Sequence, residues 1–104
     1  MPKIDLGNYQ DKDVRVFAGR DRGATARKAT GLDDHDKRDE LVEVHIPPET
    51  FAMNSSYFLA MFGQSIRTLG AEGFRRKYRF TGRDIKETIE SGIKDALHDV
   101  KASQ

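Results

Sequence analysis

The sequence predicts a single α/β domain over residues 1–104, with helices packed on a mixed sheet. Strand-like alternation and helix-like periodicity follow each other along the chain, which favours a layered fold with crossover connections. Glycines or prolines stand at the ends of these patterned segments, and no internal repeat or linker separates them. A length of 104 residues also suits one domain. We expect residues 1–13 and 101–104 to be flexible.

The first predicted elements are a strand and a helix. Residues 14–17 alternate and are rich in valine, which indicates a strand, and residues 3–6 fit a shorter strand before it. Residues 24–30 are rich in good helix formers, and Gly31 is a suitable C-terminal stop. Residues 32–40 are mostly charged and predict a solvated loop or a polar helical turn.

Two further strands are predicted in the second part of the chain. Residues 41–46 place alternate apolar side chains on one face, and Pro47 and Pro48 end this strand because neither can donate a backbone hydrogen bond. Residues 78–81 alternate in the same way and end at Gly82.

The helices of the second half are marked by apolar residues that recur at spacings of three and four. This pattern predicts a helix over residues 55–69, with Asn54 and Ser55 as favoured N-caps and Gly70 at its C-terminal end. A short helix over residues 71–77 and an amphipathic helix from Asp84 to Val100 complete the series.

The composition argues against several classes of function. The chain has no cysteine, which removes disulfides, thiol nucleophiles and cysteine-based zinc sites. No apolar run reaches the ~18–20 residues of a membrane span and no secretory signal is visible, so we expect a cytoplasmic protein without a membrane partner. His35, His45 and His98 lack the spacing of a metal pair, and no Gly-x-Ser-x-Gly motif is present. We therefore expect no enzymatic activity, metal or cofactor.

The charges are unevenly distributed, although the net charge is only +1. Residues 41–65 carry no lysine or arginine, whereas residues 66–86, the basic band, have a net charge of +5. Four basic side chains of this band lie among three aromatic residues, and they are Arg75, Arg76, Lys77 and Arg79 with Phe74, Tyr78 and Phe80. Such a set can bind phosphates and stack bases, so nucleic-acid binding is the alternative to a solvated helix face.

A glycine-rich segment follows the strand predicted over residues 14–17. Gly19, Arg20, Arg22 and Gly23 precede a predicted helix, and backbone N–H groups in such a turn can hold an anion. The spacing matches neither the P-loop nor the dinucleotide fingerprint. The competing interpretation is a tight strand-to-helix turn with solvated or salt-bridged arginines. The acidic cluster around His35 is similarly expected to be a solvated loop rather than a cation site.

Two blocks of the sequence resemble the core of STAS domains, which are small α/β domains of anti-sigma-factor antagonists and sulphate transporters. The blocks are Val42–Pro48 and Asn54–Leu59. In STAS domains a strand runs into an Asp-Ser-Ser-Gly-Leu turn that opens a helix, and here the turn reads Asn-Ser-Ser-Tyr-Phe. The chain is more similar to a STAS-like family of unassigned function from bacteria and phages. The most specific part of that similarity is the stretch Asn54–Leu59 with Phe62–Gly63. The weaker matches are Gly19–Gly23, Ala26–Lys28, Ile66–Arg67, Leu69–Gly70 and Phe74.

This resemblance implies a regulatory, protein-binding module. In anti-sigma-factor antagonists the first serine of the pair is phosphorylated by a partner kinase of the histidine-kinase-like ATPase type, and the matching position here is Ser55. The implied partner-binding residues are Asn54, Ser55, Ser56 and Tyr57. Asn54 and Tyr57 depart from the Asp and Gly of the family pattern.

Three alternatives stay open at this point. Ser55 could serve only as a helix N-cap. The chain could be a nucleic-acid adaptor that acts through the basic band, or a phage-encoded inhibitor that acts through the same segment.

Overall fold

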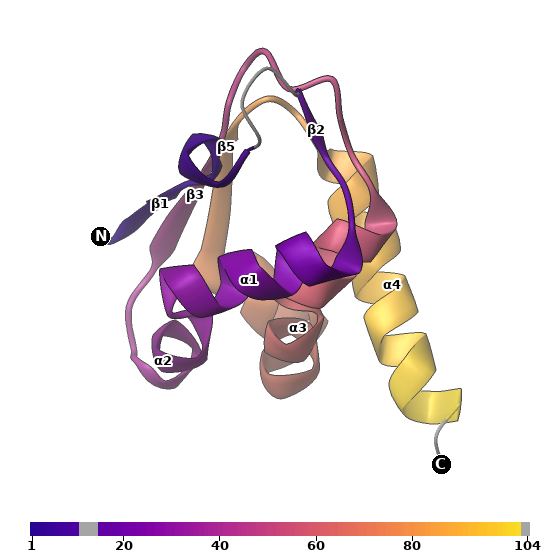
Figure 1. Cartoon of the computed structure of the whole chain (residues 1–104). Coiled ribbons are helices and arrows are strands. Elements are labelled where there is room, and N and C mark those ends of the chain that lie inside the picture. The colour runs from indigo at the N-terminus through magenta and orange to yellow at the C-terminus, as the bar shows by residue number, and fades with distance from the viewer. Residues whose placement is uncertain (11–14, 103–104) are drawn as a thin grey trace.

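Two small parallel β-sheets organise the chain (Figure 1). The computed structural model describes residues 1–10 and 15–102. The larger sheet has the order β1-β3-β5, with β1 at Lys3–Asp5, β3 at Val42–Ile46 and β5 at Tyr78–Gly82. The smaller sheet pairs β2 (Val16–Phe17) with β4 (Ala52–Met53). The predicted α/β class is therefore confirmed.

The expectation of a mixed sheet is wrong, because every ladder among the described residues is parallel. The physical reason lies in the connections. Between any two strands that pair with each other, the chain forms at least one helix. The helix returns the chain to the starting end of the sheet, so the second strand runs parallel to the first.

Four α-helices and one short 3-10 helix accompany the sheets in the described part of the chain. They are η1 (Leu6–Tyr9), α1 (Arg20–Thr30), α2 (Leu32–Lys37), α3 (Ser55–Lys77) and α4 (Lys86–Ala102). Figure 1 shows the α-helices on one side of the three-stranded sheet, with α1 and α4 each packed against α3.

Most predicted elements are confirmed, but several boundaries move. Helix α1 begins at Arg20, four residues before the predicted start, and α2 replaces the predicted loop or turn. Helix α3 joins the two helices predicted on either side of Gly70, whose φ of 78° marks the kink between them. Strand β4 was not predicted, because two residues are too few for a pattern. Val14 and Val100 belong to predicted elements but lie outside the described residues or side chains.

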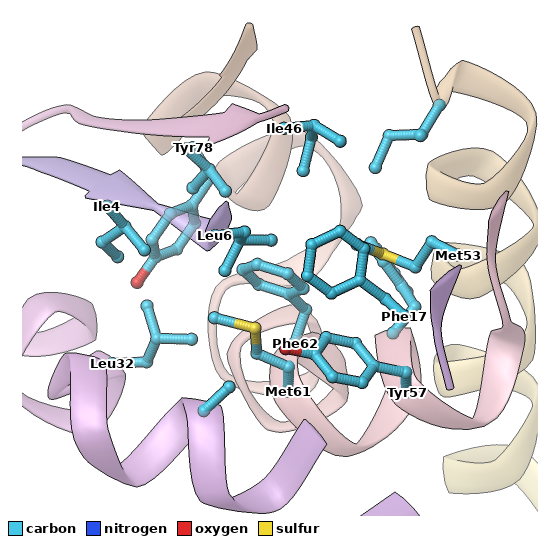
Figure 2. Close-up of a cluster of buried hydrophobic side chains, with 14 of the residues drawn as sticks. Ile4, Leu6, Phe17, Leu32, Ile46, Met53, Tyr57, Met61, Phe62 and Tyr78 are labelled. Carbon is cyan, nitrogen blue, oxygen red and sulfur yellow. The ribbon is translucent and has the colours of Figure 1, made fainter. Parts of the chain in front are cut away.

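The N-terminal segment belongs to the core. Ile4 and Leu6 are buried, and β1 pairs with β3, so Lys3–Tyr9 pack as part of the fold, while the expected flexibility of residues 1–13 stays a prediction. Residues 11–13 lie outside the described part. At the other end α4 continues to Ala102, and residues 103–104 are not described. Figure 2 shows Ile4 and Leu6 pointing into the same cluster as Tyr57, Met61 and Phe62.

The outer face of the three-stranded sheet carries polar side chains. Alternation along β3 buries Val42, Val44 and Ile46 against the helices and leaves Glu43 and His45 half-buried on the other face. Parallel sheets usually have both faces covered. Here the outward positions are polar, so this face needs no second layer of helices.

A buried ionic network ties the helices to the sheet. The Asp36 side chain of α2 is 6% exposed, and its Oδ2 accepts hydrogen bonds from Arg27 Nη2 at 3.1 Å and from the Ser65 hydroxyl at 2.7 Å. Its other oxygen accepts from the Tyr78 hydroxyl at 2.6 Å. Four elements, α1, α2, α3 and β5, thus meet at one carboxylate.

The same network satisfies polar groups inside the fold. Arg27 also donates to the Met61 carbonyl at 2.7 Å and to the Ser65 hydroxyl at 2.9 Å. Burial, followed by the hydrogen bond to Asp36, raises the pKa of Tyr78. A buried charge is tolerated only when it is paired and hydrogen-bonded, so this arrangement restricts how α1 and α2 can pack on α3.

Helices α1 and α3 cross at Gly23. A Cβ atom at Gly23 would overlap the Tyr57 carbonyl oxygen and lie 2.9 Å from the Cβ of Ala60. Only glycine therefore allows the first turns of the two helices to approach so closely. Gly63, by contrast, meets only the flexible guanidinium group of Arg67, with its nearest atoms at 3.4 Å.

We predict that Gly23→Ala lowers the free energy of unfolding by about 1–3 kcal/mol, because the two helix backbones must move apart. Gly63→Ala is the matched control within α3. It is expected to leave stability unchanged or to raise it by up to ~1 kcal/mol through better helix propensity. Urea denaturation of both variants checks this, and equal effects would contradict the assigned crossing.

Candidate docking surface

The fold brings together two groups of candidate residues that are distant in sequence. Strand β2 leads into α1 and strand β4 leads into α3, and the two strands pair in parallel with Phe17 opposite Met53. The Asn54 N–H then donates to the Phe17 carbonyl at 2.8 Å. The first turns of α1 and α3 consequently start side by side at the carboxyl ends of β2 and β4 (Figure 1).

Ser55 is the first residue of α3, and it is exposed together with Ser56. Asn54 holds the N-cap position with extended backbone angles, and its side chain makes no capping hydrogen bond. The interpretation of Ser55 as the N-cap is therefore wrong by one position. Its hydroxyl stands at the positive end of a long helix, where a negative charge is favoured.

Tyr57 does not belong to an accessible surface, which corrects its assignment as a partner-binding residue. Its side chain is 1% exposed, and its ring centroid lies 5.3 Å from that of Phe17 in the core (Figure 2). The helical period explains this, because two residues after Ser55 the side chain faces inward. Burial, with a smaller effect of Tyr9, raises the pKa of Tyr57 to about 12. Its buried hydroxyl has no hydrogen-bond partner within the described residues.

The glycine-rich segment is divided by the structure. Gly19 has a φ of 97° and precedes α1, while Arg20 and Arg22 are exposed in its first turn. Gly23 is buried at the crossing with α3, so its assignment to an anion-binding loop is wrong. The part of this candidate that remains is the start of α1, which carries the exposed Arg20 and is in the helix that packs against α3.

Phe51 was missed by the sequence analysis. Its side chain is 78% exposed on the segment that leads into β4 and α3. A groove of 510 Å³ opens beside it, between residues 50–53 and residues 83–88. Thr50 lines this groove, and its buried hydroxyl has no hydrogen-bond partner in the described part of the chain. The sequence signal that could have indicated Phe51 is that this aromatic residue belongs to none of the predicted apolar faces of helices or strands.

The basic band is dispersed rather than assembled. Lys77 is buried, and its Nζ donates to the Arg38 carbonyl at 2.6 Å and to the Glu40 carbonyl at 2.7 Å, so its assignment to a nucleic-acid surface is wrong. Arg75 forms an ion pair with Glu90 at 2.5 Å, and this contact lowers the pKa of Glu90. Arg76 and Arg79 are exposed.

The aromatic residues of that band do not form a stacking platform. Phe74 and Tyr78 are buried and Phe80 is half-buried, and their rings pack against one another and against Phe62. Phe74 faces the core from the end of α3, and Tyr78 and Phe80 face it because side chains alternate along β5.

The acidic segment is not simply solvated, because Asp36 is the buried centre of the ionic network. Within residues 1–10 and 15–102, no group of three or more His, Asp or Glu side chains is placed to hold a metal ion. Over the same residues, none of the helices has the length and apolar character required to cross a bilayer.

Comparison of the chain with protein-family models, curated sequences and solved structures gives no match. The STAS-like resemblance therefore stays a prediction that is carried by the motif residues themselves.

We predict that Tyr57→Phe leaves the free energy of unfolding at neutral pH unchanged or raises it, because an unpaired buried hydroxyl costs about 1–3 kcal/mol. The wild-type protein should lose stability as pH rises from about 10 toward 12, since the unfolded tyrosine ionises first and the folded one keeps its proton. This part of the alkaline loss should be absent in the variant.

Urea denaturation across this pH range measures both effects. Tyr78→Phe is the matched control, because its hydroxyl has a partner and its removal should destabilise the protein at neutral pH. A large loss of stability in Tyr57→Phe at neutral pH would contradict the assignment of Tyr57 as an unpaired core residue.

Proposed function

We propose that this chain is a STAS-like regulatory domain without catalytic activity of its own, which docks a partner protein at the start of α3. The supporting observation is the exposure of Ser55 and Ser56 at a helix N-terminus, beside a second helix start and the exposed Phe51. The proposed docking surface consists of Phe51, Asn54, Ser55 and Ser56, with Arg20 at its rim. We propose a cytoplasmic location for this interaction.

The chemistry of the docking surface suits a phosphorylation switch. A phosphate on Ser55 adds a charge of roughly −1.5 to −2 and three strong acceptor oxygens. The free N–H groups and the dipole of α3 favour this charge, and the neighbouring start of α1 adds Arg20. The same charge lies where a partner must make contact, so modification changes docking without a change of fold.

The proposed partner is a kinase of the histidine-kinase-like ATPase type. The γ-phosphoryl group of ATP passes to the Ser55 oxygen, the bond to ADP breaks, and the hydroxyl proton leaves to solvent or to a base of the kinase. This domain supplies only the acceptor oxygen and the surface to which the kinase binds.

Phe51 supplies the apolar part of this binding surface. Aromatic side chains often dominate the binding free energy of protein interfaces. Phe51 is 78% exposed and lines the groove, so its ring and a side chain of the partner placed in the groove could be buried together on docking.

We predict that incubation with ATP and a cognate ATPase-type kinase adds one phosphate, which peptide mass spectrometry assigns to Ser55. Ser55→Ala should abolish the added mass, whereas Ser56→Ala, the matched control one residue away, should keep it. Ser55→Glu should weaken binding of the unmodified partner by at least about tenfold, the equivalent of roughly 1.4 kcal/mol.

A second pair of variants separates docking from phosphorylation. Phe51→Ser should weaken binding to the kinase, while Leu41→Ser, at an exposed apolar residue preceding β3, should not. The proposal fails if no phosphate reaches Ser55 and if Ser55→Glu and Phe51→Ser both bind the partner as the wild type does.

The nucleic-acid alternative has less support than the docking proposal. Of its four candidate residues, only Arg76 and Arg79 are exposed without also being committed to the Glu90 pair or to buried carbonyls. The aromatic residues that would stack on bases lie in the core. A phage-encoded inhibitor that acts through the basic band would use these exposed arginines instead of the docking surface, so the Ser55 and Phe51 variants should leave its binding unchanged.

A further inference from the structure

Strand β5 is an edge strand with backbone groups directed away from the sheet. The Arg83 N–H donates to the Ile46 carbonyl at 3.0 Å, and the parallel register places Phe80 opposite Val44. Because backbone direction alternates along a strand, Arg79 and Thr81 bond to β3. The N–H and C=O groups of Phe80 therefore point to the open edge, as do the Tyr78 carbonyl and the Gly82 N–H.

These outward groups are complementary to themselves. In an antiparallel pair of β5 strands centred on Phe80, each Phe80 N–H would donate to the Phe80 carbonyl of the other copy. Each Gly82 N–H would likewise donate to the Tyr78 carbonyl of the other copy. Two outward groups are left over. The Tyr78 N–H already donates to the Phe74 carbonyl at the end of α3, and the Gly82 carbonyl at the end of the strand would face solvent.

We propose that the partner of this edge is a second copy of the chain, joined β5 to β5 across a two-fold axis at Phe80. The two three-stranded sheets would then form one continuous sheet of six strands. This interface is separate from the docking surface and does not depend on the proposed function. An exposed edge strand presents unpaired backbone groups with which the strand of another chain can pair.

The side chains beside the edge fit such a pairing. A mostly apolar pocket of 410 Å³ lies along β5, and Phe74, Tyr78, Phe80 and Ile89 contribute its apolar walls. The half-buried Phe80 ring would meet its own copy there, and aromatic cross-strand pairs stabilise antiparallel strands.

The outer face offers complementary charge. In this register Arg79 stands opposite Thr81 of the second copy. Thr81 donates to Glu43 at 2.8 Å, so Arg79 would approach a carboxylate across the new pair. The two Arg79 side chains lie diagonally and are not directly opposed.

The absence of cysteine permits a test that is specific to this register. Arg79 and Thr81 of the other copy would form a non-hydrogen-bonded pair with Cα atoms about 4.5 Å apart, within the range of a disulfide. Arg79→Cys and Thr81→Cys proteins, mixed and oxidised, should give the mixed disulfide dimer. Either protein alone should give far less, because its own cysteines lie diagonally at about 7–8 Å.

Sedimentation equilibrium of charge variants gives a second measurement. Thr81→Lys places a lysine opposite Arg79 and should weaken the dimer at least about tenfold, while Glu43 on its own chain keeps the monomer folded. The double variant Arg79→Glu/Thr81→Lys should restore association, and Thr68→Lys, at an exposed position of α3, is the control for the added positive charge. A monomer at every concentration, or a dimer without the mixed disulfide, would overturn the proposal.

Discussion

The carboxylate of Asp36 is the point at which the separate elements of this domain are held together. It accepts hydrogen bonds from α1, α3 and β5, and it comes itself from α2. Because a buried carboxylate is costly without such partners, arrangements that separate these elements are disfavoured. The network fixes α1 across α3, and the close approach at Gly23 completes that crossing.

The position of the docking surface follows from this packing. With α1 fixed across α3, the pairing of β2 with β4 sets both helix starts at one end of the molecule. Ser55 and Phe51 lie there, while Phe80 lies on the edge of the other sheet. Docking at α3 and association through β5 therefore use different surfaces, and a dimer would present two docking surfaces.

The sequence predicted those elements whose position and type depend on their own local residue pattern. Strand β3 and the kink at Gly70 follow from alternation and from a residue that tolerates positive φ. The sequence did not predict the burial of polar side chains whose hydrogen-bond partners are distant in the chain. From the sequence, Lys77 is predicted to be a surface charge, because the backbone carbonyls that accept its hydrogen bonds come from a distant segment. Asp36 is predicted to belong to a solvated cluster, because its partner Tyr78 lies 42 residues away in the sequence. The family motif places Tyr57 on the contact surface, but the helical period of α3 turns its side chain into the core.

Asp36 couples the helices to the sheet through its hydrogen bond with Tyr78. A double-mutant cycle of Asp36→Ala and Tyr78→Phe, followed by urea denaturation, measures this coupling directly. The two residues share a hydrogen bond, so the cycle should give an interaction free energy of about 1–3 kcal/mol. Effects that add to within about 0.5 kcal/mol would mean that the two side chains act independently and that Asp36 does not couple α2 to β5.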